Sequence, residues 1–131
     1  MTNNLKKVIS SAAVVAMVAS SASAFAVTFP DVDATANYAG AVQTLSALNI
    51  VQGDDNGLFN PDNNVTRGEF TKMVVEALGE GSVAEATTTS QFTDAATTTQ
   101  HWAAGYIATG VSEGWINGYG DGTFGPDDSV T

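Results

Sequence analysis

The sequence predicts an all-α protein built from tandem helix–loop–helix repeats. The first observation is an internal repeat: the motif Phe-x-Pro-Asp-x-x-Val-Thr occupies residues 59–66 and recurs 65 residues later, at 124–131. The second is a set of apolar residues at helical spacing on either side of that motif. The third is a pair of loops rich in Gly and Asp between these apolar segments. Recurrence at a fixed offset indicates a modular architecture.

The first helix of copy one is expected from about Ala36 to Leu48. Its apolar residues fall at i, i+3, i+4, i+7 and i+10, which is one face of a helix: Tyr38, Ala41, Val42, Leu45 and Leu48. Asn49 is predicted to end this helix in a left-handed conformation, and Gly114 is its counterpart in copy two. The polar loop 53–64 follows, composed mainly of turn-forming residues.

The second helix has the clearest start signal in the chain. Thr66 at the N-cap and Glu69 three residues later form a predicted capping box, and Gly79 is predicted to end the helix. Its apolar residues again share one face, which we expect to be buried: Phe70, Met73, Val74, Ala77 and Leu78.

The predicted boundaries are a leader at 1–26, repeat one at 27–79, a linker at 80–91 and repeat two at 92–131. In repeat two a helix is expected to start near 101–103, although Gly105 and Gly110 weaken it. Tyr106, Ile107 and Trp115 are expected in the core. The sequence stops at Thr131, where the second helix of this repeat should begin. We therefore expect the chain to be the N-terminal part of a longer protein.

Residues 1–26 have the features of a secretory signal peptide. Lys6 and Lys7 precede a short apolar stretch at 8–19, and Ala24-Phe25-Ala26 fits a cleavage site before Val27, with 22–24 as a second candidate site. The apolar stretch is shorter than the roughly 20 residues that a spanning helix needs. These features predict export with cleavage and no membrane span.

Composition excludes several classes of function. Residues 27–131 contain two basic and 14 acidic residues, a formal net charge of −12, which argues against binding to nucleic acid or to an anionic membrane. The chain has no cysteine, so a core must hold it without disulfides. His101 has no metal-ligand spacing around it, and no nucleophile or phosphate-binding motif is present. We expect no enzyme activity, no cofactor and no metal site.

Several motifs in their order resemble the S-layer homology (SLH) domain family. They are Phe-x-Asp at 29–31 and 92–94, Trp-Ala at 102–103, Gly-Tyr-x-Asp-Gly-Thr-Phe-x-Pro at 118–126 and Thr-Arg-x-Glu at 66–69. The resemblance implies three repeats in a pseudo-threefold helical assembly. It also implies non-covalent anchoring of a secreted protein at the bacterial cell wall or cell surface. The implied partner is a secondary cell-wall polysaccharide linked to peptidoglycan, often bearing a pyruvate ketal.

The same resemblance implies a set of glycan-binding residues: Arg67, Trp102, Asp31, Asp94, Gly53 and Gly118. A guanidinium forms two parallel hydrogen bonds to a carboxylate, and free N–H groups at the start of the helix would favour an anion. The alternatives are that Arg67 makes a salt bridge or faces solvent, that Trp102 belongs to the core, and that Asp31 and Asp94 cap turns.

The two copies depart from the family pattern in different ways. Copy one has Asn37 in the position of Trp102, and its loop lacks the tyrosine, while copy two stops before its arginine. A groove that combines Arg67 with residues of copy two would be nearly complete. Two alternative functions remain: a surface-layer subunit whose repeats self-assemble, and the anchor of an exported enzyme or outer-membrane channel.

Overall fold

The computed structural model describes residues 28–87, 89–94 and 101–130. The expected signal peptide at 1–26 lies outside the described residues. The described part contains α1 (Ala39–Ala47), α2 (Arg67–Ala77), α3 (Gly81–Ala86) and α4 (Ala104–Ser112). Within those ranges the extended pairing consists of one isolated antiparallel bridge between Thr66 and Ser129. The prediction of an all-α fold is confirmed.

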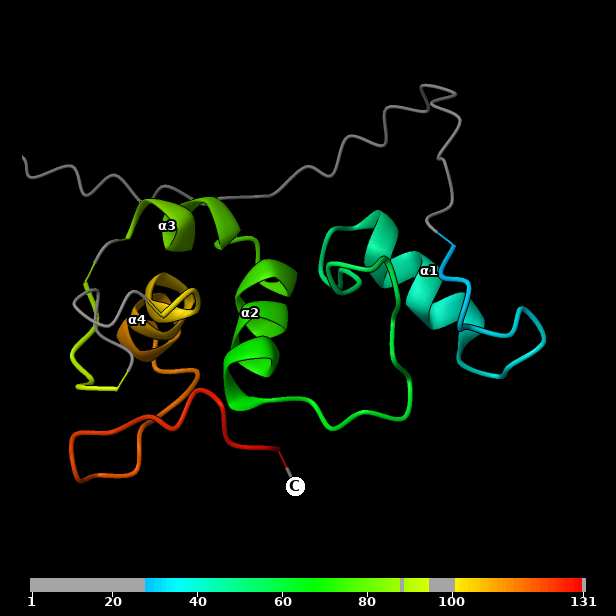
Figure 1. Ribbon diagram of the computed structural model, residues 1–131. Coiled ribbons are helices and arrows are strands. Elements are labelled where there is room, and N and C mark those ends of the chain that lie inside the picture. Colours follow the sequence, from blue (N-terminus) through cyan, green and yellow to red (C-terminus); the bar gives the residue numbers. More distant parts are fainter. Residues whose placement is uncertain (1–27, 88, 95–100, 131) are drawn as a thin grey trace, which may run out of the picture.

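Helices α2, α3 and α4 pack on one another, and α1 lies on the other side of α2 (Figure 1). The main core lies under α4, where four residues of repeat two are buried together: Phe92, Ala103, Ile107 and Phe124. A second cluster joins α2, α3 and α4 through Val75, Ala84 and Tyr106. The segment after α4 returns beneath it to the start of α2 (Figure 1), so repeat two closes against repeat one.

The two repeats share backbone geometry as well as sequence. Three pairs of left-handed residues lie 65 positions apart: Asn49 with Gly114, Gly57 with Gly122, and Asn60 with Gly125. The predicted left-handed ends of the first helices, at Asn49 with φ 64° and Gly114 with φ 75°, are confirmed. Positions with positive φ favour Gly and Asn because other side chains are strained there.

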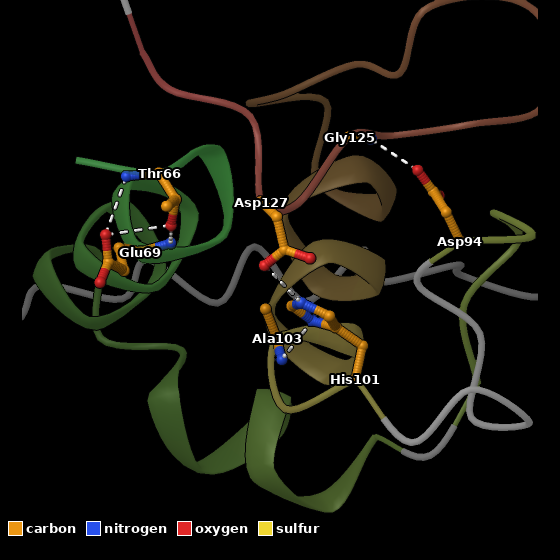
Figure 2. Close-up of polar contacts among 7 residues, drawn as sticks. All are labelled: Thr66, Glu69, Asp94, His101, Ala103, Gly125 and Asp127. Carbon is orange, nitrogen blue, oxygen red and sulfur yellow. Dashed lines mark hydrogen bonds and ion pairs between the residues drawn. The ribbon is translucent and has the colours of Figure 1, made fainter. Parts of the chain in front are cut away.

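The start of α2 is as predicted. The Glu69 N–H donates to Thr66 Oγ1 at 3.2 Å, and the Thr66 N–H donates to Glu69 Oε2 at 2.8 Å (Figure 2). This reciprocal capping box satisfies two N–H groups that the helix cannot pair internally. Gly79 follows the helix with φ 85°, as expected of a helix-ending glycine.

The buried face of α2 differs from the predicted one. Gly68, Thr71 and Val75 are buried, whereas Phe70 is 47% and Leu78 54% exposed. A Cβ on Gly68 would lie 3.1 Å from the Pro126 carbonyl oxygen and 3.3 Å from the Ala103 Cβ. The face with small side chains therefore allows the start of α4 and the returning segment to come close, and the larger apolar face remains outside.

Helix α3 lies in the segment expected to be a linker. Its Ala84 is only 2% exposed because α3 packs against α4. A Cβ on Gly105 would overlap the Ala84 carbonyl oxygen and lie 2.7 Å from the Thr87 carbonyl oxygen. Gly105 lowers the helix propensity of α4, as the sequence indicated, and its missing side chain is what admits α3.

The core predictions for repeat two are confirmed at two positions and wrong at a third. Tyr106 and Ile107 are buried, but Trp115 is 36% exposed because it follows the turn that ends α4. Burial and the hydrogen bond from its hydroxyl to Glu76 raise the pKa of Tyr106 to about 12. No helix among the described residues has the length and apolar character required to cross a bilayer.

Candidate functional site

Arg67 extends from the first position of α2 into the loop of repeat two. Its Nε donates to the Phe124 carbonyl oxygen at 2.9 Å, and Nη2 donates to the Asn117 carbonyl oxygen at 3.1 Å. Its Cζ lies 4.6 Å from the ring centroid of Tyr119 and 4.4 Å from that of Phe124. Two aromatic rings and two carbonyls thus hold the half-buried cation, which forms no salt bridge with any of the described residues.

The guanidinium retains hydrogen-bonding capacity. Its planar fork carries five N–H donors, and the two bonds above use the Nε donor and one donor on Nη2. The remaining N–H groups on Nη1 and Nη2 have no acceptor among the described residues. These two nitrogens form the outer edge of the fork, which matches the spacing of the two oxygens of a carboxylate.

The expectation of free backbone N–H groups at the start of α2 is wrong. The first three N–H groups of the helix all donate to protein oxygens: Arg67 to Asp128 O at 2.8 Å, Gly68 to Pro126 O at 2.8 Å, and Glu69 to Thr66 Oγ1 at 3.2 Å. The segment from Pro126 to Asp128 occupies the place where an anion would meet these groups. These backbone N–H groups are therefore not available to an anion.

Trp102 lies beside the start of α2 and is 54% exposed, so it does not belong to the core. Its Cζ2 is 3.5 Å from the position that a Cβ on Gly68 would occupy, which places the indole next to the residue that follows Arg67. Trp102 also lines a cavity of about 310 Å³ together with His101, Glu85 and Tyr106. Arg67 is not part of that cavity wall.

His101 fixes the start of the α4 segment. Its Nδ1 accepts the Ala103 N–H at 3.1 Å, and its Nε2 lies 3.4 Å from Asp127 Oδ1 (Figure 2). The imidazole ring lies 5.7 Å from the Trp102 ring, measured between centroids. His101 therefore holds the backbone of Ala103, the residue that follows Trp102. The described residues contain no cluster of acidic and histidine side chains able to hold a metal.

Asp31 and Asp94 perform the same task in the two repeats. The Asp31 carboxylate accepts the N–H groups of Phe59 at 2.9 Å and Asn60 at 2.6 Å. The Asp94 carboxylate accepts those of Phe124 at 2.9 Å and of Gly125 at 2.7 Å, the second of which is drawn in Figure 2. Each carboxylate ties the entry segment of its repeat to the end of its loop, which is the turn-capping alternative raised by the sequence.

Both carboxyl groups have a lowered pKa. The Phe59 N–H bond lowers the pKa of Asp31, because it stabilises the charged form. At Asp94 partial burial raises the pKa, but the bonds from the N–H groups of Phe124 and Gly125 outweigh it, and the net pKa lies below its ordinary value. The ionised form of both groups is therefore the one that the fold stabilises.

Gly53 and Gly118 provide room for the aromatic side chain of each entry segment. A Cβ on Gly53 would lie 2.7 Å from the Phe29 ring, and one on Gly118 would overlap the Phe92 ring. Phe29 in turn packs against Phe59, with ring centroids 5.5 Å apart, and Phe92 packs against Phe124 at the same distance. The two glycines thus set the distance between entry segment and loop.

The structure places Arg67 in the loop of repeat two, the combination that the sequence raised as a hypothesis, and it places Trp102 next to Gly68, the residue that follows Arg67. Asp94 and Gly118 shape that loop, whereas Asp31 and Gly53 shape the loop of repeat one. Sequence reasoning missed Tyr119, whose ring covers Arg67. The available signal was the difference between the copies, because the residue 65 positions before Tyr119 is Asp54.

Comparison with known proteins identifies the class. The family model of the S-layer homology domain matches residues 28–71 and 91–131. This chain belongs to the S-layer homology domain family, and it carries two tandem matches to it.

Similar proteins are found at bacterial surfaces. The chain is 36% identical over 130 residues to a "Cell surface protein" of Thermoanaerobacter kivui, covering 97% of this chain and 17% of the relative. It is 34% identical over 108 residues to a "Cellulosome-anchoring protein" of Acetivibrio thermocellus, covering 79% and 23%. It is 33% identical over 132 residues to "S-layer protein sap" of Bacillus anthracis, covering 98% and 16%. The chain thus spans less than a quarter of the length of each of these relatives.

Proposed function

We propose that this chain anchors an exported protein non-covalently to the bacterial cell envelope. The ligand in this proposal is an anionic secondary cell-wall polysaccharide linked to peptidoglycan, with a sugar-borne carboxylate such as a pyruvate ketal. The observation that carries it is the outer edge of the Arg67 guanidinium, which has no acceptor among the described residues while the rest of the group is held in place. The family membership and the names of the cell-surface relatives support the same role.

The charge of the chain makes this arginine stand out. Arg67 and Lys72 are the two basic residues between 27 and 131, which also hold all 14 acidic residues. Lys72 is engaged elsewhere: its Nζ donates to Gln52 Oε1 at 2.9 Å and lies 5.8 Å from the centroid of the Tyr106 ring. An anionic polymer approaching this surface is repelled in general, so specific binding needs a directed cation, and Arg67 supplies it.

The six residues expected to bind the glycan divide into two groups in this proposal. Arg67 contacts the carboxylate, and Trp102, which is half-exposed next to Gly68, stacks against the apolar face of a sugar ring. Asp94 and Gly118 hold the loop on which Arg67 rests, and Asp31 and Gly53 do the same for the loop of repeat one. Catalysis plays no part in this role.

Co-sedimentation with cell-wall sacculi tests the proposal. Sacculi with their secondary polymer intact are compared with sacculi from which acid has extracted it, using the unchanged protein, Arg67→Lys and Lys72→Ala. We expect binding that requires the polymer, is lost in Arg67→Lys because a point charge replaces a bidentate fork, and is kept in Lys72→Ala. Circular dichroism shows that each variant is folded. A folded protein that binds neither preparation, or binds both equally, contradicts the proposal.

A second candidate function is self-association within a surface layer, and exposed apolar side chains on α1 and α2 favour it. Leu48 is 63% exposed, and Phe70 and Leu78 are about half exposed. Packing against a further helical repeat, as in a pseudo-threefold assembly, would also cover them. Sedimentation velocity over a range of concentrations separates these outcomes, because self-association depends on concentration and intramolecular packing does not. Phe70→Ser should abolish any association that uses this face.

A further inference from the structure

We propose that Tyr119 and Asp128 are positioning residues of the anion site, which fix the Arg67 guanidinium so that only its outer edge meets a carboxylate. The role rests on the proposed function, but the arrangement that produces it is independent of any ligand. Neither residue was among those expected to bind the glycan.

The three residues form a closed ring of contacts. The Tyr119 ring lies over the Arg67 guanidinium, with its centroid 4.6 Å from Cζ. The Tyr119 hydroxyl donates to Asp128 Oδ2 at 2.8 Å. The Asp128 carbonyl oxygen then accepts the Arg67 backbone N–H at 2.8 Å. Tyr119 is 54% exposed, and the bond to Asp128 helps to hold its ring over the cation.

Gly125 shows that this arrangement is built into the loop. Its φ is 68°, and a Cβ there would overlap the Asp128 carboxylate and lie 2.6 Å from Tyr119 Cε2. The side chains of Tyr119 and Asp128 therefore pack directly against the backbone of Gly125. The hydrogen bond to Asp128 also raises the pKa of Tyr119, because the bond stabilises the neutral phenol.

The fixed orientation restricts how a ligand can approach. A carboxylate can pair with a guanidinium along its side edge, through Nε and one Nη, or along its outer edge, through Nη1 and Nη2. The bonds to Phe124 and Asn117 occupy Nε and one N–H of Nη2. Only the outer edge remains, so the site selects a carboxylate that projects from its sugar and reaches the fork end-on.

Repeat one cannot build the same site. The positions equivalent to Tyr119 and Asp128 are Asp54 and Asn63. The Asp54 carboxylate accepts the N–H groups of Asn56 and Leu58, both at 2.9 Å. A guanidinium entering that loop would meet a negative charge where Tyr119 supplies an aromatic ring, which neutralises the cation and removes that ring from above it. The positioning device therefore belongs to repeat two alone.

The experiment measures both the guanidinium and its ligand. Proton–nitrogen NMR follows the Arg67 Nε–H, and titration calorimetry measures binding of a methyl hexoside that carries a pyruvate ketal, with the hexoside lacking the ketal as the neutral probe. The variants are Tyr119→Ala, Tyr119→Phe and Asp128→Ala in the otherwise unchanged protein. Tyr38→Ala is the matched control, because Tyr38 is an exposed tyrosine of repeat one.

We expect Tyr119→Ala to weaken binding of the ketal-bearing hexoside by about three- to tenfold, the size of a lost partly exposed cation–π contact. The Nε–H resonance should shift as the ring is lost. Tyr119→Phe should restore the affinity to within about threefold, because the ring remains and only its anchor to Asp128 is lost. Asp128→Ala should resemble Tyr119→Phe, and Tyr38→Ala should change neither quantity.

An unchanged Nε–H resonance in Tyr119→Ala overturns the positioning role, whatever the affinity. If the unchanged protein binds neither hexoside, the proposed anionic ligand fails, and the resonance still decides whether Tyr119 and Asp128 orient Arg67. If Tyr119→Ala does not fold, Tyr119→Phe and Asp128→Ala decide the question through the same signal, and an unchanged resonance in both contradicts the proposal.

Discussion

The Nε–H of Arg67 donates to the carbonyl oxygen of Phe124 across 2.9 Å, so a side chain of repeat one is held by the backbone of repeat two. The Phe124 N–H is itself held by Asp94 at 2.9 Å, which places the residue at the meeting point of entry segment, loop and cation. The proposed ligand contact and the contact between the repeats therefore involve the same arginine.

Arg67→Ala should destabilise the protein as well as remove the candidate ligand contact. It removes two hydrogen bonds from a charged donor and two ring contacts, so we expect the free energy of unfolding to fall by about 1–3 kcal/mol. Urea unfolding followed by circular dichroism measures this. Lys72→Ala should cost less, because Lys72 donates one hydrogen bond, to Gln52 within repeat one, and approaches the Tyr106 ring of repeat two only to 5.8 Å from its centroid. Equal stability of Arg67→Ala and the unchanged protein would contradict a role for Arg67 in joining the repeats.

Gly118→Ala should destabilise repeat two. The added Cβ overlaps the Phe92 ring and lies 2.6 Å from the Thr123 carbonyl oxygen, so we expect a loss of about 1–3 kcal/mol from overpacking. Gly40→Ala is the matched control: a Cβ at Gly40, inside α1, meets nothing within 4 Å. That substitution should raise stability by about 0.5–1 kcal/mol through helix propensity. Thermal unfolding of the two variants should therefore shift in opposite directions.

Acid should weaken the protein through Asp31 and Asp94. Both carboxyl groups have a pKa in the folded protein below their ordinary value of 3.8. Their stabilising contribution is complete well above pH 3.8 and is lost as the pH falls through 3.8 towards the folded values. We expect urea midpoints to be steady near neutral pH and to decline below about pH 5.

Asp94→Asn supplies the control for this pH dependence. The amide cannot ionise and offers a weaker acceptor to the N–H groups of Phe124 and Gly125, so the variant should be less stable at neutral pH. It should also lose less stability on acidification than the unchanged protein. A variant that declines as steeply as the unchanged protein would show that the acid sensitivity arises elsewhere.

Thr109→Val should stabilise the protein. Thr109 is 6% exposed, and its Oγ1 is buried with no hydrogen-bond partner among the described residues. Valine has nearly the same shape and removes the cost of burying that hydroxyl, so we expect a gain of about 1 kcal/mol. Thr71→Val is the matched control, because the Thr71 hydroxyl donates to the Arg67 carbonyl oxygen at 2.7 Å. Chemical denaturation should show a gain at 109 and a loss at 71.

Helical periodicity and capping residues predicted α1, α2 and α4, because those signals are local. Helix α3 escaped prediction because its six residues, Gly-Ser-Val-Ala-Glu-Ala, carry no apolar periodicity. It is stabilised by the burial of Ala84 against Val75 and Tyr106, which belong to other helices. The predicted buried face of α2 was also wrong. Hydrophobicity favours burial of Phe70 over Thr71, but α4 packs on the side of α2 that carries Thr71, so Thr71 is buried and Phe70 is exposed.

The motifs of the candidate site could be recognised in the sequence, but their arrangement in space could not be predicted from it. Arg67 and Trp102 could be named from the resemblance to the family. The ring over Arg67 depends on the returning segment that brings Asp128 against the start of α2. The same segment occupies the helix N–H groups, which is why the expected anion site at the backbone is closed. Contacts of this kind span about 60 residues of sequence, and local patterns do not report them.

The difference between Asp54 and Tyr119 makes the tandem directional. A loop with tyrosine can receive the arginine of the copy before it, and a loop with aspartate cannot receive one in the same way. The two copies are therefore not interchangeable, although their motifs and their left-handed turns recur 65 positions apart. A protein engineer who duplicates or permutes them must keep a loop with tyrosine downstream of every arginine, or the contact between the repeats will lose the ring that covers the guanidinium.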